Sequence, residues 1–95
     1  MNRVDGKVAI VTGGTQGLGK AIAMNLAKMG ANGIVTLGRN EQRGEEVANS
    51  IHQETGCETY FFKTELSDVN NCREAIFFAL EKFPQIDILV NAAGL

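Results

Sequence analysis

The stretch Val8-Ala-Ile-Val-Thr-Gly-Gly-Thr-Gln-Gly-Leu-Gly19 decides the fold of this chain. Its opening residues are almost purely apolar, as in a strand that is buried on both faces of a parallel sheet. Glycines follow at Gly13, Gly17 and Gly19, and apolar residues then recur at helical spacing. A strand, a glycine-rich turn and a helix in this order offer backbone N–H groups and the positive end of a helix dipole to an anion. The stretch therefore predicts a site that holds the pyrophosphate of a dinucleotide.

The glycines of this turn have separate tasks. Gly13 lets the chain turn sharply out of the strand, and Gly17 removes the Cβ that would hold a phosphate away from the backbone. Gly19 lies in the first turn of the helix, where it lets that helix pack closely on the sheet. We therefore expect the cofactor contacts of this segment to come from the following residues: Gly13, Thr15, Gln16, Gly17, Leu18 and Gly19.

Two other fingerprints and one simpler explanation compete for the same glycines. The GxGxxG form would need a glycine where Thr15 stands. The run 14–20 fits the GxxxxGK start of a P-loop, but Ala21 replaces the Ser or Thr hydroxyl that would bind Mg²⁺. Asp87, the best-placed acidic residue of the fourth strand, lies near its start, away from the end where a metal-holding carboxylate is expected. A P-loop nucleotide binder is therefore a remote third alternative, and a turn without any ligand is the simplest explanation of all.

Strand-like and helical segments alternate along the whole chain. Strands are expected at 7–12, 33–38, 58–63 and 86–91, and helices at 18–29, 41–55 and 68–83. This alternation calls for a parallel α/β sheet with right-handed crossovers. In the doubly wound form the strand order is 3-2-1-4, with the first two helices on one face and the third on the other. The turn after the first strand and the segment Asn91–Gly94 after the fourth then meet at the point where the order reverses.

Local signals set the helix ends. Gly30 and Gly56 follow the first and second helices, at positions that favour a residue with positive φ. Asn40 can cap the second helix, and Ser67 or Asp68 the third. The apolar positions then predict the buried faces: Leu18, Ile22, Leu26 and Met29 in the first helix; Val47, Ala48 and Ile51 in the second; and Val69, Cys72, Ile76, Ala79, Leu80 and Phe83 in the third.

The composition is that of an ordinary globular domain, which we expect to span 1–95. Of the 95 residues, 44% are hydrophobic and 21% charged, and the formal net charge of −2 gives no footprint for nucleic acid. No run approaches the ~20 apolar residues of a membrane span, and the apolar run after Lys7 does not have the character of a signal-peptide h-region. Two isolated cysteines and one histidine make a metal site unexpected. These features favour a cytoplasmic protein with reduced thiols.

Two motifs together resemble a known family. Thr12-Gly13-x-x-x-Gly17-x-Gly19 is similar to the cofactor motif of the short-chain dehydrogenases/reductases, and Leu89-Val-Asn-Ala-Ala-Gly94 resembles their Asn-Asn-Ala-Gly segment after the fourth strand. Ala92 replaces the second Asn of that segment. The resemblance covers essentially the whole chain, in the right order and spacing. It implies an NAD(P)-binding Rossmann-type domain of an oxidoreductase, with Asn91, Ala92, Ala93 and Gly94 at the cofactor.

The end of the second strand bears on which nicotinamide cofactor is bound. An acidic residue there would bind the adenosine ribose, whereas this chain has Gly38-Arg39-Asn40. Arg39 can form a forked, charge-assisted hydrogen bond to a phosphate. In the family, an arginine in this place implies NADP(H), and the hydroxyl of Thr15 can contact the same phosphate. Gln16 stands where some NADP-dependent members have a basic residue, so NAD(H) stays possible.

The resemblance also implies an adenine contact after the third strand. Glu65-Leu66 occupies the place where the family usually has an acidic residue beside adenine. Glutamate is one methylene longer than aspartate, and a solvated loop carboxylate is the alternative for Glu65.

The catalytic residues that the resemblance implies are not found in this chain. The family uses a Ser and a Tyr-x-x-x-Lys pair on one helical face. Here the only tyrosine is Tyr60, and Lys63 follows at an odd offset on a strand, which sends the side chains to opposite faces. Ser50 and Ser67 belong to the nucleotide half.

We therefore expect an N-terminal cofactor-binding part of a longer reductase of carbonyl or alcohol substrates, inactive alone. A catalytically inactive dinucleotide-binding or assembly module is the alternative. The small-molecule substrate would be bound only by the complete protein. The apolar edge of the fourth strand is expected to favour association.

Overall fold

Strands and helices alternate strictly through residues 3–15, 17–65 and 67–92, the part of the chain that this computed structural model describes. In chain order the elements are β1 (Val8–Thr12), α1 (Gly17–Lys28), β2 (Gly33–Gly38), α2 (Glu41–Thr55), β3 (Glu58–Lys63), α3 (Val69–Lys82) and β4 (Ile88–Asn91).

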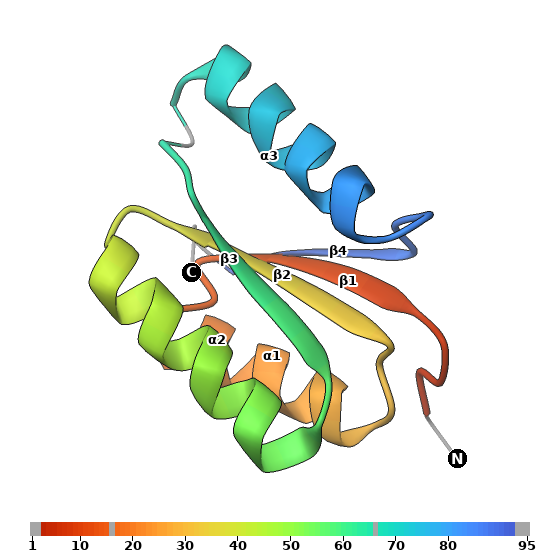
Figure 1. Cartoon of the computed structure of the whole chain (residues 1–95). Coiled ribbons are helices and arrows are strands. Elements are labelled where there is room, and N and C mark those ends of the chain that lie inside the picture. Colours follow the sequence, from red (N-terminus) through yellow and green to blue (C-terminus); the bar gives the residue numbers. More distant parts are fainter. Residues whose placement is uncertain (1–2, 16, 66, 93–95) are drawn as a thin grey trace.

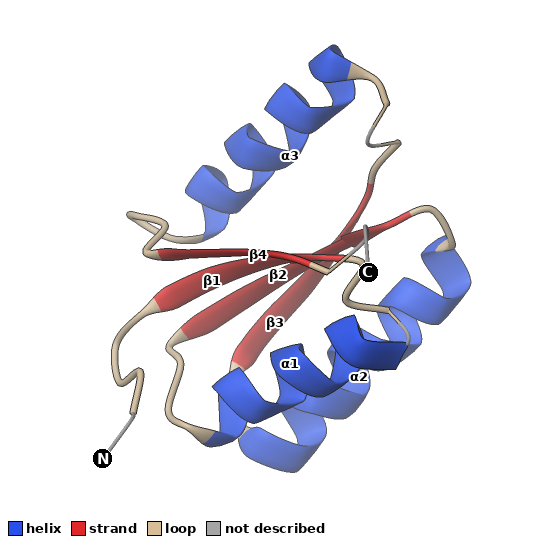
Figure 2. Cartoon of the chain, turned by 180° about the vertical axis from the view of Figure 1, so that it is seen from behind, coloured by secondary structure: helices blue, strands red, loops and turns tan. Residues whose placement is uncertain are grey.

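The strands form one parallel sheet in the order β3-β2-β1-β4. Helices α1 and α2 lie side by side on one face of the sheet, and α3 covers the other (Figures 1 and 2). This confirms the predicted doubly wound arrangement. Because β1 lies between β2 and β4, its residues are buried throughout, which explains why its sequence is almost purely apolar.

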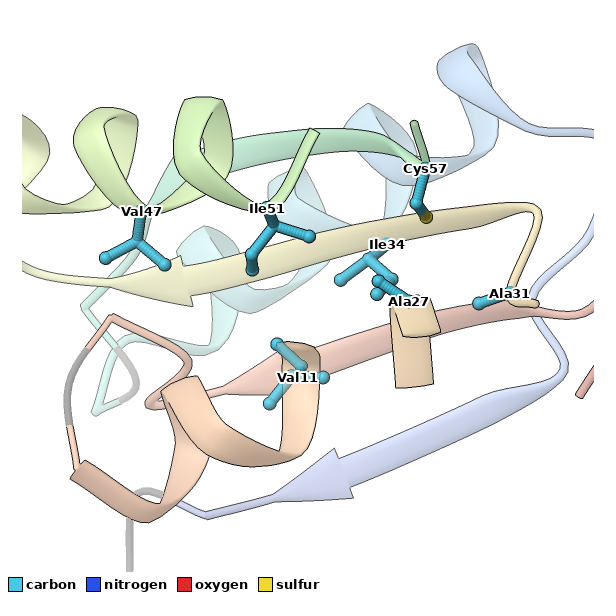
Figure 3. Packing of buried hydrophobic residues seen from close by; sticks show 8 residues of the cluster. Val11, Ala27, Ala31, Ile34, Val47, Ile51 and Cys57 are labelled. Carbon is cyan, nitrogen blue, oxygen red and sulfur yellow. The ribbon is translucent and has the colours of Figure 1, made fainter. Parts of the chain in front are cut away.

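Alternate residues of the central strands supply two separate cores. On the side of α1 and α2, Val11 and Ile34 belong to one core with Val47 and Ile51 of α2 (Figure 3). On the side of α3 the core consists of the intervening strand residues and a few helix residues: Val8, Ile10, Val35, Leu37, Ala75, Ala79 and Phe83. A period of two in the strands therefore gives a sheet that is covered on both faces.

The predicted apolar face of α1 is largely wrong, because Leu18 is exposed and Ile22, Leu26 and Met29 are only partly buried. The residues that α1 buries are Gly19, Ala23 and Ala27, whereas the side chain of Leu18 is 56% exposed. Small residues on this face let the helix axis approach the sheet closely, so the larger Leu26 lies partly buried at the flank. Bulk alone therefore did not identify the side that contacts the sheet.

The predicted face of α3 is confirmed at Ala79 and Phe83, which are buried, and is wrong at three other positions. Val69, Ile76 and Leu80 are 70%, 39% and 46% exposed, whereas Ala75, which was not predicted, is fully buried. Aromatic side chains explain why α3 turns its alanines toward the sheet. Their ring centroids lie 4.9 Å apart in the pair Phe62–Phe78, 6.3 Å apart in Tyr60–Phe78 and 5.8 Å apart in Tyr60–Phe83. These rings fill the space beside α3, and only alanines fit directly beneath it.

The predicted helix ends agree closely with the structure. Gly30 and Gly56 have φ of 97° and 79°, as expected for residues that end a helix. The side chain of Asn40 accepts a hydrogen bond from the N–H of Arg43 at 3.0 Å, and Asp68 rather than Ser67 caps α3. Helix α3 ends one residue earlier than predicted, since the residue before a proline favours extended backbone.

Strand β4 begins at Ile88, two residues later than predicted. Asp87, which immediately precedes it, already pairs with the sheet through its own atoms. Its N–H donates to the carbonyl oxygen of Val8 at 2.8 Å, and its Oδ2 accepts from the N–H of Val8 at 2.9 Å. The carboxylate thus supplies a hydrogen bond where a strand would offer a backbone carbonyl.

Candidate functional site

The candidate site lies where the carboxyl ends of β1 and β4 meet. In the register of the sheet Thr12 stands opposite Asn91, and the Thr12 hydroxyl donates to Oδ1 of Asn91 at 2.9 Å. The N–H of Ala92 donates to the carbonyl oxygen of Thr12 at 3.1 Å. The segment after β4 is therefore tied directly to the start of the glycine loop, as the strand order predicts. The predicted site residues Ala93 and Gly94 lie outside the described residues.

The loop backbone has the shape that a phosphate cradle requires. Gly13 has a φ of 72°, and its N–H donates to the carbonyl oxygen of Leu37 at 2.9 Å, which anchors the turn to β2. Gly17 has a φ of 57°, and a Cβ there would meet no described atom within 4 Å. The open side of Gly17 faces space that a ligand can enter, so the absence of a side chain serves access rather than packing.

Two other glycines hold the loop and helix together. A Cβ on Gly19 would overlap the carbonyl oxygen of Gly13, so α1 packs against the loop backbone at this residue. We had expected Gly19 to pack against the sheet, and this expectation is wrong. Sequence reasoning missed Gly14, where a Cβ would lie 2.9 Å from Cγ2 of Thr36 and 3.2 Å from the carbonyl oxygen of Val11. The adjacent Gly-Gly pair was the available signal for this second close approach.

The electrostatics of the α1 N-terminus suit an anion. The helix begins at Gly17 and has no acidic residue in its first turn, so nothing in that turn neutralises the positive end of its dipole. Leu18, a predicted cofactor contact, is exposed in the same turn. Gln16 lies outside the described residues. Together with the open face of Gly17, this end of α1 fits a pyrophosphate group.

The end of β2 brings together the residues that were expected to select the cofactor. A Cβ on Gly38 would lie 3.2 Å from Cγ2 and 3.3 Å from Oγ1 of Thr15, so the Thr15 side chain covers this glycine. Thr15 is buried, whereas Arg39 and Asn40 are exposed. The Oδ1 atom of Asn40 already accepts the capping hydrogen bond of α2. Among these residues, Arg39 therefore presents the charged group at this edge.

The loop after β3 lies at the same edge of the sheet. The N–H of Thr64 donates to the carbonyl oxygen of Gly38 at 2.8 Å. The N–H of Glu65 donates to Oδ1 of Asn71, and its carboxylate accepts a hydrogen bond of 3.3 Å from the Ser67 hydroxyl. Glu65 is exposed and thus accessible to a ligand. Leu66, its predicted companion, lies outside the described residues.

A surface hollow of about 470 Å³ adjoins the loop, between α1 and α2. Its lining carries two cations that were not among the predicted site residues, Lys20 and Arg43. For Arg43 the available signal was a basic residue three positions after the predicted cap Asn40. The full lining comprises Thr15, Gly17, Lys20, Arg43, Glu46, Val47 and Ser50.

Tyr60 lies in the middle of β3, away from the glycine loop. Its hydroxyl donates to Oε2 of Glu58 at 3.0 Å, and this hydrogen bond to a carboxylate raises the pKa of Tyr60. The Nζ of Lys82 lies 5.0 Å from the centroid of the ring. A raised pKa is opposite to the lowered value that a tyrosine beside a catalytic lysine would have.

The described residues also bear on three other possibilities: a P-loop, a metal site and a membrane span. Asp87 binds the N–H of Val8 at the amino end of β1, opposite to the end with the glycine loop. Within the described ranges there is no group of three or more His, Cys, Asp and Glu side chains that could hold a metal ion. Nor does any of the described helices combine the length and the apolar character that crossing a membrane requires.

Comparison with known proteins places these features in context. Residues 7–95 match the family model described as short chain dehydrogenase. The 3beta-hydroxysteroid dehydrogenase of Mediterraneibacter gnavus is 38% identical over 95 residues, which are 100% of this chain and 34% of that protein.

Solved structures are similar as well. The L-sorbose reductase of Gluconobacter frateurii, complexed with NADPH and L-sorbose, is 33% identical with a TM-score of 0.92, over 98% of this chain and 35% of that one. The alcohol dehydrogenase of Thermococcus sibiricus, complexed with 5-hydroxy-NADP, is 32% identical with a TM-score of 0.85, over 90% and 36%. The chain spans about a third of the length of these proteins.

Proposed function

We propose that this chain, which belongs to the short-chain dehydrogenase/reductase family, is the NADP(H)-binding part of an oxidoreductase that acts on a carbonyl or alcohol substrate. The observation that carries this proposal is the open glycine loop at the switch point, with Arg39 at the adjoining end of β2. The reductase and the alcohol dehydrogenase compared above were solved with NADPH and an NADP derivative, which supports a nicotinamide dinucleotide.

The residues of the chain have distinct tasks in this proposal. Backbone N–H groups of the run 13–19 and the positive end of α1 hold the pyrophosphate. Glu65 and Leu66 contact the adenine side, and the segment Asn91–Gly94 contacts the cofactor mainly through its backbone. The bound cofactor supplies or accepts the hydride. The side chains that bind substrate and move its proton belong to the rest of a longer protein, as the family resemblance implies.

The preference for the 2′-phosphate rests on Arg39 and Gly38. A guanidinium forms forked hydrogen bonds with a phosphate, each worth about 1.5–3 kcal/mol. An acidic side chain at Gly38 would repel the 2′-phosphate and bind the ribose hydroxyls of NAD instead. Gly38 has no side chain, and Thr15 places its hydroxyl beside it. We therefore expect at least a tenfold preference for NADPH over NADH, since about 1.4 kcal/mol corresponds to that factor.

A second candidate function is a dinucleotide-binding or assembly module without activity. It is favoured by Tyr60, the one tyrosine of the chain, which lies on β3 with its hydroxyl bonded to Glu58 and away from the glycine loop. The reducing environment of the cytoplasm remains our expectation for a chain with two cysteines, of which Cys57 is buried.

Fluorescence titration of the purified protein with NADPH and NADH tests the proposed binding. Turnover is then measured with a panel of ketones and aldehydes, and we expect none from this chain alone. Tight NADPH binding without turnover supports the binding role. Failure to bind either dinucleotide at millimolar concentration, by protein that circular dichroism shows to be folded, would overturn both candidate functions.

A further inference from the structure

The hollow between α1 and α2 has the dimensions of a ligand site. Its volume of about 470 Å³ falls within the roughly 300–1,000 Å³ typical of small-molecule pockets. It begins at Thr15 and Gly17 of the glycine loop and extends along α2 to Ser50. The hollow therefore starts at residues that already belong to the proposed cofactor site.

The charges around this hollow favour an anion. Lys20 and Arg43 contribute two positive charges and Glu46 one negative charge. The amino ends of α1 and α2 lie at the same edge, and each adds partial positive charge. Thr15 and Ser50 add hydroxyl groups that can donate hydrogen bonds to phosphate oxygens.

Arg43 is connected to the end of β2 through one capped turn. Its N–H donates to Oδ1 of Asn40 at 3.0 Å, which fixes the start of α2, and Arg39 immediately precedes that cap. Thr15 lines the hollow beside Arg43 and also covers Gly38. Thr15 thus joins the hollow to the place where we put the 2′-phosphate.

We infer that Arg43 is a second cation for the 2′-phosphate of the dinucleotide, and that it determines cofactor specificity together with Arg39. This inference rests on the proposed function. A phosphate monoester carries close to two negative charges at neutral pH, so one guanidinium leaves part of that charge unpaired. Arg43 supplies the second positive charge from α2, because the loop has the neutral Gln16 where another basic residue would serve.

Charge-neutralising variants of two arginines provide the test. Arg43→Gln is compared with Arg73→Gln, which removes the same charge from an exposed position of α3 on the opposite face of the sheet. NADPH and NADH affinities are measured by fluorescence titration. For Arg43→Gln we expect NADPH to bind roughly tenfold more weakly, as loss of one charge-assisted contact implies, and NADH affinity to change less than about twofold. For Arg73→Gln we expect both affinities to stay within about twofold.

The conservative variant Arg43→Lys separates charge from structure. It keeps the positive charge without the fork, so we expect it to recover part of the NADPH affinity. If Arg43→Gln lowers NADPH and NADH affinity alike, and Arg43→Lys does the same, Arg43 has only a structural role and the inference is wrong.

The outcome also distinguishes this inference from the proposed function. If the wild-type protein binds NADPH and NADH equally well, the proposed preference for NADPH is wrong, and the inference is wrong with it. A wild-type preference that Arg43→Gln leaves unchanged would overturn the inference alone and leave Arg39 as the sole discriminating cation.

Discussion

At the scale of single residues, the candidate site depends on glycines, at which a Cβ is missing. Gly17 leaves the loop open to a ligand, whereas Gly19 and Gly14 let separate stretches of backbone approach each other. Gly38 acts in two ways: it carries no charge that would repel a phosphate, and it leaves room for the side chain of Thr15. The glycines of this chain are therefore best distinguished by what a Cβ would touch.

Substitution of both Gly38 and Arg39 tests which nicotinamide cofactor is selected. We expect Gly38→Asp combined with Arg39→Ala to reverse the preference from NADPH to NADH, since the carboxylate binds ribose hydroxyls and repels a 2′-phosphate. The ratio of the two dissociation constants is the measurement. Gly38→Ala with Arg39 retained is the matched control, because its Cβ presses on Thr15 without adding charge. An unchanged ratio in the double variant would show that Arg39 plays no part.

Gly19→Ala tests the contact between α1 and the loop. The added Cβ overlaps the carbonyl oxygen of Gly13, which cannot move without distorting the turn. We expect the free energy of unfolding to fall by about 1–3 kcal/mol, as for other overpacked sites, and the affinity for NADPH and NADH to fall together. Urea unfolding and titration measure the two effects. Asn25→Ala, at an exposed position of the same helix, should change neither; retained wild-type stability in Gly19→Ala would contradict the close contact.

At the scale of elements, small residues decide where the helices sit. Helix α1 contacts the sheet through Ala23 and Ala27, and α2 approaches β3 at Gly44, where the ring of Phe61 occupies the place of a Cβ. Gly44 lies on the buried face of α2, where the absence of a Cβ permits close packing against Phe61.

Gly44→Ala tests the packing of α2. Alanine favours a helix by about 1 kcal/mol over glycine, so at an exposed site this change would stabilise the protein. Here we expect a net loss of about 1–3 kcal/mol in urea unfolding, because the Cβ overlaps the Phe61 ring. In a double-mutant cycle, the added change Phe61→Leu should offset part of the cost of Gly44→Ala. Strict additivity of the two changes would contradict a direct contact.

At the scale of the whole molecule, the two strands beside β1 differ: β2 is paired on both sides, whereas β4 is paired on one side only in the described sheet. Strand β1 pairs with β2 and β4, and β4 lies at the edge of the described sheet, with Leu89 68% exposed. An exposed apolar edge strand favours pairing with another chain. The expected association through this edge stays a prediction.

Leu89→Lys tests that association, because a charge on an edge strand opposes edge-to-edge pairing. We expect the variant to sediment as a smaller species than the wild type at equal concentration in analytical ultracentrifugation. Leu80→Lys, on the exposed side of α3, is the control for a general effect of charge. If Leu80→Lys alone dissociates the protein, the helix face rather than the strand edge is the contact.

The sequence by itself determined the strand order, the glycine loop, the cap at Asn40, and the meeting of the loop with Asn91, whereas the structure decided for Asp68 over Ser67 as the cap of α3. These features depend on local backbone preferences and on the handedness of crossovers, which neighbouring residues specify. Only the tertiary structure decided which faces α1 and α3 bury, because each helix has apolar residues on more than one side. The small residues of α1 face the sheet, whereas packing against aromatic rings selects the face of α3. The tertiary structure also decided that Arg43 and Lys20 share a hollow with Thr15. That proximity joins residues from α1, α2 and the loop, and no spacing along the chain encodes a distance between separate elements.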